Sequence, residues 1–159
     1  MLVWKQGIKK TAPMVQSRLD IPVPLPEDLK EYVHPSLPEI EAGVPFAFDT
    51  ETTGLSPHGD DRIVGYSVSI DGGSSFYVAF RHDGDSGNMD EQVALDYLKY
   101  LMELPNLKVM ANANFDLRFV MAEGITPQPP FFDVLLAERL VNEYRRSYSL
   151  DALGELYTG

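Results

Sequence analysis

The sequence contains no cysteine among its 159 residues, so the chain can form neither a disulfide framework nor a thiolate metal site. A reducing, cytoplasmic setting is therefore expected. The sequence also lacks the run of roughly 20 apolar residues that a membrane helix needs. Its first residues, MLVWKQGIKKTAPM, show no continuous apolar core followed by a cleavage site, so no secretory signal is expected. These absences favour one ordinary globular domain.

Positive charge is also scarce, since 13 Lys and Arg stand against 24 Asp and Glu, for a net charge of −11. A protein that holds nucleic acid only by neutralising its phosphates should be basic. An acidic chain can still handle nucleic acid if divalent cations bridge its carboxylates to the phosphates. The charge therefore argues against a passive binder and leaves a metal-dependent enzyme open.

No Ser–His or Cys–His arrangement indicates a nucleophile supplied by the protein. The three histidines, His34, His58 and His82, all fall in expected loops, where an ordinary solvated role is the simplest interpretation. The acid-rich loop DGDSGNMDE at 83–91 does not fit a calcium loop, because Gly87 is one position early and Ala94 stands in place of the bidentate Glu. We interpret it as a solvated turn, with Asn88 capping the helix that follows.

Six of the twelve prolines lie within residues 1–41, which include the stretch DIPVPLPEDL. Each proline lacks a backbone donor and has a fixed φ, so this stretch cannot sustain a helix or an internal strand. We predict an extended arm over residues 1–42, ordered by contact with something else through Val23, Leu25 and Leu29. The compact domain is predicted over 43–159.

Alternating apolar residues predict three strands at the start of this domain, in VPFAFDTE (44–51), DRIVGYSVSI (61–70) and SFYVAF (75–80). Two short links join them, too short for a helical crossover, so the three strands should form an antiparallel meander.

The hydrophobic period then changes to that of a helix. The stretch 88–104 places Val93, Tyr97, Leu98, Leu101 and Met102 on one stripe, and Pro105 ends it. A fourth strand is predicted at 107–112 and a helix at 115–124, closed by Gly124. Two further helical segments are predicted at 131–142 and 149–157. The fold class is therefore mixed α/β, with the helices late in the chain.

Two acids follow the first predicted strand. Asp49 and Glu51 are two residues apart and should project to the same side of the strand. Like charges so close destabilise each other unless a cation lies between them. A third acid, Asp116, stands where a predicted strand passes into a helix, and open α/β sheets bind ligands at such strand ends. Together the three would make an oxygen-rich site for Mg²⁺ or Mn²⁺, although two acids in a solvated loop are the simpler alternative.

The motifs FDTETTGL (48–55) and NANFD (112–116) closely resemble the first two motifs of the DEDD superfamily of 3′–5′ exonucleases. The nearer match is the proofreading domain of polymerase I-type DNA polymerases, and the resemblance runs from about Val44 to the C-terminus. It implies a ribonuclease-H-like sheet and hydrolysis of the terminal phosphodiester at a single-stranded DNA 3′ end. Two Mg²⁺ or Mn²⁺ ions roughly 4 Å apart would assist the reaction. A polymerase domain is the expected partner, in the same longer chain or in another.

The resemblance also assigns roles to residues. It implies that Asp49, Glu51 and Asp116 are the metal-ligand and catalytic carboxylates. The implied substrate-binding residues are Leu55, which wedges against the terminal base, Asn112 and Phe115 beside the 3′ end, and Thr50 through its backbone. Ordinary core packing remains the alternative for Leu55 and Phe115. Asp133 also matches a family Asp, and we interpret it as a structural helix cap.

One family feature is missing, because no Tyr or His is followed by Asp at the spacing of the third motif, Tyr-x-x-x-Asp or His-x-x-x-x-Asp. Tyr148 and Asp151 are one residue short of it, and Ser149 or Asp151 is better interpreted as a helix cap. We therefore expect a domain that is incomplete at its C-terminus, as a fragment of a larger polymerase or, less favoured, a natural short protein. By itself it should hydrolyse DNA poorly.

Two other functions remain open. An RNA 3′ exonuclease like RNase D uses the same first two motifs. A non-catalytic module could instead grip single strands or another subunit through EYRRSYSL (143–150), where Arg145 and Arg146 are interleaved with Tyr144 and Tyr148. A charged helix end is the simpler interpretation of that stretch.

Overall fold

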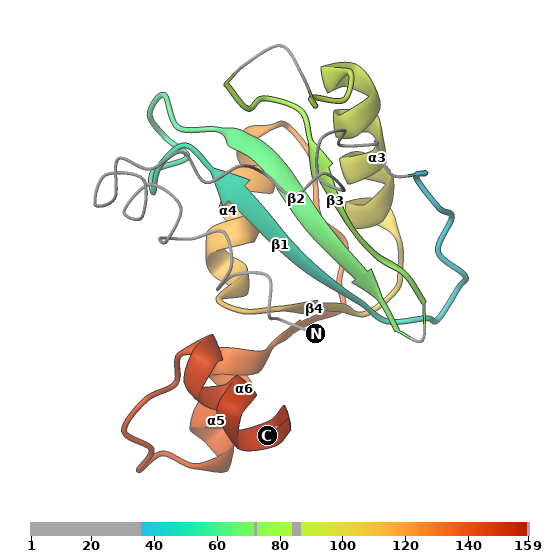
Figure 1. The fold of residues 1–159 in the computed structure, drawn as a ribbon. Coiled ribbons are helices and arrows are strands. Elements are labelled where there is room, and N and C mark those ends of the chain that lie inside the picture. The colour runs from blue at the N-terminus through green and yellow to red at the C-terminus, as the bar shows by residue number, and fades with distance from the viewer. Residues whose placement is uncertain (1–35, 72, 84–86, 159) are drawn as a thin grey trace, which may run out of the picture.

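The computed structural model describes residues 36–71, 73–83 and 87–158 (Figure 1). They form one mixed five-stranded sheet in the order β3-β2-β1-β4-β5, together with four helices, α3 to α6. The mixed α/β class expected from the sequence is confirmed. No helix within the described ranges is both long and apolar enough to cross a membrane.

The antiparallel meander is also confirmed. Strand β1 (Phe46–Thr52) pairs with β2 (Ile63–Ile70), and β2 pairs with β3 (Ser75–Ala79), in both cases antiparallel. On the other side of β1 the pairing becomes parallel, first to β4 (Lys108–Met110) and then from β4 to β5 (Phe131–Asp133). Since parallel neighbours meet at their carboxyl ends, β1, β4 and β5 finish at one edge of the sheet.

The core lies between this sheet and the helices α3 (Glu91–Glu103) and α4 (Ala113–Ala122). Tyr66 of β2 is fully buried there, and its hydroxyl donates to the carbonyl of Ala94 at 2.7 Å, so its one polar atom is satisfied. The largest fully buried side chains come from both layers: Tyr66, Phe46, Phe48, Lys108, Phe119, Ile63, Leu98, Leu101, Met102, Met110, Val68 and Val78.

Helix α3 corrects two details of the prediction. Its buried stripe begins at Ala94, whereas Val93 is 48% exposed. Ala94 lies three residues before Tyr97 and four before Leu98, so it shares their face of the helix. Its N-cap is Asp90, whose side chain accepts from the N–H of Val93 at 3.1 Å.

Asn88, the predicted cap of α3, has a different structural role. Its carboxamide accepts from the N–H of His82 at 2.9 Å and donates to the carbonyl of the same residue at 2.8 Å. The side chain therefore bridges the two sides of the loop after β3, two residues before the helix cap. Residues 84–86 of that loop lie outside the described residues.

The prediction of one helical segment over 131–142 is wrong at its start. Residues 131–133 form strand β5, paired with β4 in the register Lys108 with Phe131, and only then does α5 (Val134–Val141) begin. The apolar run FFDVLL suits either structure locally, and it is the pairing with β4 that makes its first part a strand. Helix α6 (Leu150–Thr158) follows, and in Figure 1 it lies with α5 below the sheet.

Residues 36–42, the last part of the predicted arm, contact the domain. Ile40 is only 6% exposed, and its N–H donates to the Tyr100 hydroxyl at 3.0 Å. The hydroxyl of Tyr97 donates to the carbonyl of Pro38 at 2.7 Å. This part of the arm is therefore held on α3, while Val23, Leu25 and Leu29 lie outside the described residues.

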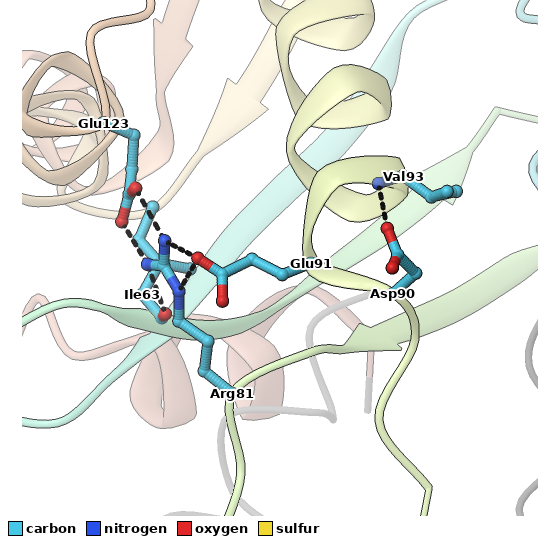
Figure 2. A network of polar contacts seen from close by, with 6 residues as sticks. All are labelled: Ile63, Arg81, Asp90, Glu91, Val93 and Glu123. Carbon is cyan, nitrogen blue, oxygen red and sulfur yellow. Dashed lines mark hydrogen bonds and ion pairs between the residues drawn. The ribbon is translucent and has the colours of Figure 1, made fainter.

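Arg81, which follows β3, joins three elements (Figure 2). Its guanidinium donates to Glu91 at the start of α3 at 2.7 Å and to Glu123 at the end of α4 at 2.5 Å, and it also reaches the carbonyl of Ile63 at 3.3 Å. These contacts raise the pKa of Arg81 further above its usual range, against the effect of burial. The guanidinium thus ties both core helices to the sheet.

Lys108 of β4 is fully buried, and its ammonium group donates to three carbonyls, those of Leu104 at 2.5 Å, Asn106 at 3.2 Å and Gln128 at 2.9 Å. Burial lowers the pKa of Lys108 to about 8, so at neutral pH most molecules still carry the charged form. The side chain therefore fastens β4 to the end of α3 and to the segment before β5.

Candidate active site

The site is built on the second half of β1. Asp49 is 7% exposed and Thr50 is 4% exposed, whereas Glu51 is half-buried. Asp49 and Glu51 occupy alternate positions of the strand and share one side of it, opposite Ser67 and Gly65 of β2. The register with β2 shifts directly after Glu51, and such an irregularity bends the strand where these acids lie.

Asp116 comes to this place from the first turn of α4. It is fully buried, and its Oδ1 accepts from the N–H of Thr50 at 2.9 Å and from the Thr50 hydroxyl at 2.7 Å. The two sequence motifs therefore meet in space, with Asp116 held at the residue between Asp49 and Glu51, although 66 positions separate it from Thr50.

Asp49, Glu51 and Asp116 are the predicted metal ligands. Among the residues that the structure describes, no group of three or more His, Cys, Asp or Glu is arranged so that it could hold a metal ion. The donors that do lie here, two buried carboxylates and one half-buried one, are the hard oxygen ligands that Mg²⁺ and Mn²⁺ prefer. The chemistry of the donor set fits such ions, and the role of Asp49, Glu51 and Asp116 as ligands remains a prediction.

Asn112 lies at the entrance to α4, at its N-cap. It has a left-handed backbone, with φ 64° and ψ 54°, and its side chain is exposed and makes no capping hydrogen bond within the described part of the chain. Phe115, one turn later, is half-buried with its ring 5.1 Å from that of Phe119. Thr50 donates both its N–H and its hydroxyl to Asp116, and its role beside the 3′ end stays a prediction.

Leu55 is carried by the loop between β1 and β2 and is 82% exposed, so core packing does not explain it. The Asp61 carboxylate holds the loop by accepting from the N–H of Ser56 at 3.0 Å. It also explains Gly54, since a Cβ at that position would overlap the carboxylate. The loop is therefore a hydrogen-bonded turn on which the Leu55 side chain is exposed to solvent.

Asp133 caps α5 as predicted, accepting from the N–H groups of Leu135 at 2.9 Å and Leu136 at 3.1 Å. It accepts equally from Ala113 at 2.9 Å and Asn112 at 3.3 Å, at the start of α4. Burial acts to raise the pKa of this carboxyl, but the four N–H groups together bring it below its ordinary value. The sequence analysis missed this second contact, because it depends on β4 and β5 lying side by side with Met110 opposite Asp133.

The stretch 143–150 is partly used within the protein. Arg145 forms an ion pair with Glu138 at 2.5 Å, and the Tyr148 hydroxyl donates to the carbonyl of Asn142 at 2.7 Å. Tyr144 and Arg146 are exposed. These internal contacts leave half of the aromatic and basic side chains for a binding surface.

The remaining predictions concern a helix cap and the three histidines. The Ser149 hydroxyl accepts from the N–H of Ala152 at 3.3 Å, so Ser149 caps α6 as expected. His58 is exposed, His82 is hydrogen-bonded to the Tyr77 hydroxyl at 2.5 Å, and His34 lies outside the described residues.

Several known protein sequences are similar to this chain. The profile of a family described as 3′–5′ exonuclease matches residues 27–159. The DNA-directed DNA polymerase of Pseudomonas phage M6 is 30% identical over 132 residues, covering 76% of this chain and 20% of the phage protein. DNA polymerase I of Borreliella burgdorferi is 26% identical over 111 residues, covering 70% of this chain and 12% of that protein. The chain thus spans a fifth or less of these relatives.

Solved structures of nucleases and polymerases are also similar to this chain. Brucella melitensis NrnC bound to pGG has a TM-score of 0.59 and 26% identity, over 79% of this chain and 57% of that one. The POL domain of Pol1 from M. smegmatis, in complex with DNA primer-template and dNTP, has a TM-score of 0.57 at 20% identity, over 72% of this chain and 19% of that one. The second likeness concerns the fold alone.

Proposed function

Because this chain belongs to the 3′–5′ exonuclease family of polymerase I-type DNA polymerases, we propose that it acts on the single-stranded 3′ end of DNA as a proofreading exonuclease domain. The observation that carries the proposal is the contact between Asp116 and Thr50. It joins the two motifs that hold all three candidate acids. An arm over 1–42, a nuclease domain over 43–159, a polymerase domain as partner and a cytoplasmic setting belong to the same proposal.

Asp49, Glu51 and Asp116 would hold the divalent ions. Bound Mg²⁺ or Mn²⁺ supplies an activated water and stabilises the leaving 3′ oxygen. Thr50 fixes the Asp116 carboxylate through two donors on one oxygen, which orients the other oxygen before any ion arrives. Because Asp49 and Asp116 are buried, little water surrounds their carboxylates, and the attraction between these carboxylates and a bound cation would be stronger than in water.

The strand would be held by the side chains around these acids. Leu55, exposed on its fixed turn, would press against the terminal base, and Asn112 and Phe115 would lie beside the terminal nucleotide. Phe115 still presents part of its ring, since it is only half-buried, and an aromatic face is a stacking surface for any base.

The test is metal binding by a variant that lacks two acids. Replacing Asp49 and Glu51 with Ala should abolish Mn²⁺ binding, measured by titration calorimetry, and with it binding of a single-stranded oligodeoxynucleotide. The matched control replaces the exposed acids Asp96 and Glu143 with Ala, which should leave both affinities unchanged. Undiminished Mn²⁺ affinity in the first variant would remove the enzymatic proposal in favour of a binding module.

Nucleotide release from the wild-type chain measures its catalytic competence. We expect slow Mn²⁺-dependent release from a 3′ end, because the third motif with its Tyr and fourth acid is not in this sequence. Rapid turnover would contradict that expectation and show that three acids suffice.

The second candidate function is an RNA 3′ exonuclease, which the likeness to NrnC solved with pGG favours. Degradation of DNA and RNA strands of one sequence separates the two, since only RNA offers 2′-hydroxyls. Faster loss of the RNA strand would favour the second candidate.

A further inference from the structure

One carboxylate, that of Asp133, accepts from the first N–H groups of two helices. Capping α5 requires only the bonds from Leu135 and Leu136. The bonds from Asn112 and Ala113 are additional, and they fasten the start of α4 to the end of β5. Asp133 therefore holds the backbone at the start of α4, from which Asn112 projects.

The backbone of Asn112 depends on this contact. An N-cap asparagine usually has an extended backbone and caps the helix with its own side chain. Here the backbone is left-handed, a conformation that is uncommon for residues other than glycine, although asparagine tolerates it better than most. Asp133 supplies the acceptor that the helix start needs, and the Asn112 side chain is exposed and takes no part in capping the helix.

We propose that Asp133 is a positioning residue of the nuclease site. By capping α4 in place of Asn112, it holds Asn112 in the left-handed conformation and keeps the Asn112 carboxamide directed at the bound strand. This inference rests on the proposed function, and it assigns Asp133 a role beyond that of a structural cap.

The variant that isolates this role is Asp133→Ser. Serine caps a helix well, so α5 keeps its cap, but the shorter side chain cannot reach Asn112 and Ala113. The matched control is Asp90→Ala, which removes the cap of α3, whose side chain bonds only the Val93 N–H in that helix. Asn112→Gly retains the left-handed backbone without strain and removes the carboxamide.

The measurement is the affinity for a short 5′-labelled single-stranded oligodeoxynucleotide with Ca²⁺ present, followed by fluorescence anisotropy. Asp133→Ser and Asn112→Gly should each weaken binding about tenfold, the effect of losing one good hydrogen bond. The double variant should bind no more weakly than Asn112→Gly alone, because both act through one carboxamide. Asp90→Ala should lower stability and leave the affinity unchanged.

Wild-type affinity in Asp133→Ser, or full additivity with Asn112→Gly, would overturn the inference and leave the proposed function standing. Failure of the wild-type chain to bind the strand would instead remove the proposed function, and the inference with it. If Asp133→Ser does not fold, Asp133→Asn takes its place, since it retains the shape and one acceptor oxygen. It should weaken binding, and wild-type affinity in that variant would equally overturn the inference.

Discussion

At the scale of single residues, exposure separates side chains that support the fold from those offered to a ligand. Thr50 and Asp116 are buried and bonded to each other, so they fix geometry. Leu55 is exposed on a turn that Asp61 holds and Gly54 makes room for. The exposed Leu55 side chain buries little surface within the protein, so it is available for contact with a bound strand.

Replacing Leu55 with Ala should therefore weaken the binding of single-stranded DNA while leaving the stability of the fold almost unchanged. Because the side chain is 82% exposed, the free energy of unfolding should change by less than about 0.5 kcal/mol. Affinity for single-stranded DNA should fall roughly tenfold if the side chain becomes buried against a base. Anisotropy titrations and urea denaturation measure the two quantities.

The control for this prediction is Leu140→Ala. Leu140 of α5 is 84% exposed, so it undergoes the same chemical change at equal exposure. Its replacement should alter neither quantity. An equal loss of affinity in both variants would mean that DNA contacts general apolar surface, and that Leu55 has no special place in the site.

At the scale of elements, two cations hold the core helices to the sheet. The partly buried Arg81 contacts the start of α3 and the end of α4, and the fully buried Lys108 joins β4 to the end of α3. Arg81 is the more informative, because its two acidic partners differ in exposure. The Glu123 side chain is 14% exposed and that of Glu91 is 55% exposed. The ion pair with Glu123 should therefore contribute more to the free energy of unfolding than the pair with Glu91, since water weakens an exposed ion pair.

Replacing Arg81 with Met should lower the free energy of unfolding by about 2 kcal/mol, because it leaves the half-buried Glu123 carboxylate without its charged donor. Replacing Glu91 with Gln should cost about 0.5 kcal/mol or less. Urea denaturation at pH 7 measures both. Equal costs would contradict the assignment of the larger part to Glu123.

This network also predicts a pH dependence. The hydrogen bond from Arg81 holds the pKa of Glu91 below its ordinary value of 4.5, against the effect of burial. A carboxyl whose pKa is lowered by folding stabilises the fold fully above that ordinary value, and the contribution is lost as the pH falls through the folded pKa. The stability difference between wild type and Glu91→Gln should therefore shrink as the pH falls below 4.5. A constant difference would contradict it.

At the scale of the whole molecule, the net charge of −11 repels polyanions such as nucleic acid and so disfavours their binding. Strand binding should therefore require a divalent cation, and EDTA should weaken it by at least about tenfold. Anisotropy titrations with Ca²⁺ and with EDTA measure this. Tight binding in EDTA that falls steeply with monovalent salt would instead indicate the non-catalytic module suggested by residues 143–150.

The amino-acid sequence by itself determined the antiparallel meander and the long helices, and it indicated the three candidate acids. Those features depend on periods of two and 3.6 residues and on motifs a few residues long, all of which are local. Locality also explains the small errors at Val93 and Asn88, where neighbouring positions compete for one stripe or one cap.

Only the tertiary structure decided which distant groups meet. Residues 131–133 are a strand because β4 lies beside them, Asp133 spans two helix starts because those strands end together, and Asp116 meets Thr50 across 66 positions. A hydrogen bond between distant residues depends on how layers pack, and no pattern within one segment records that packing.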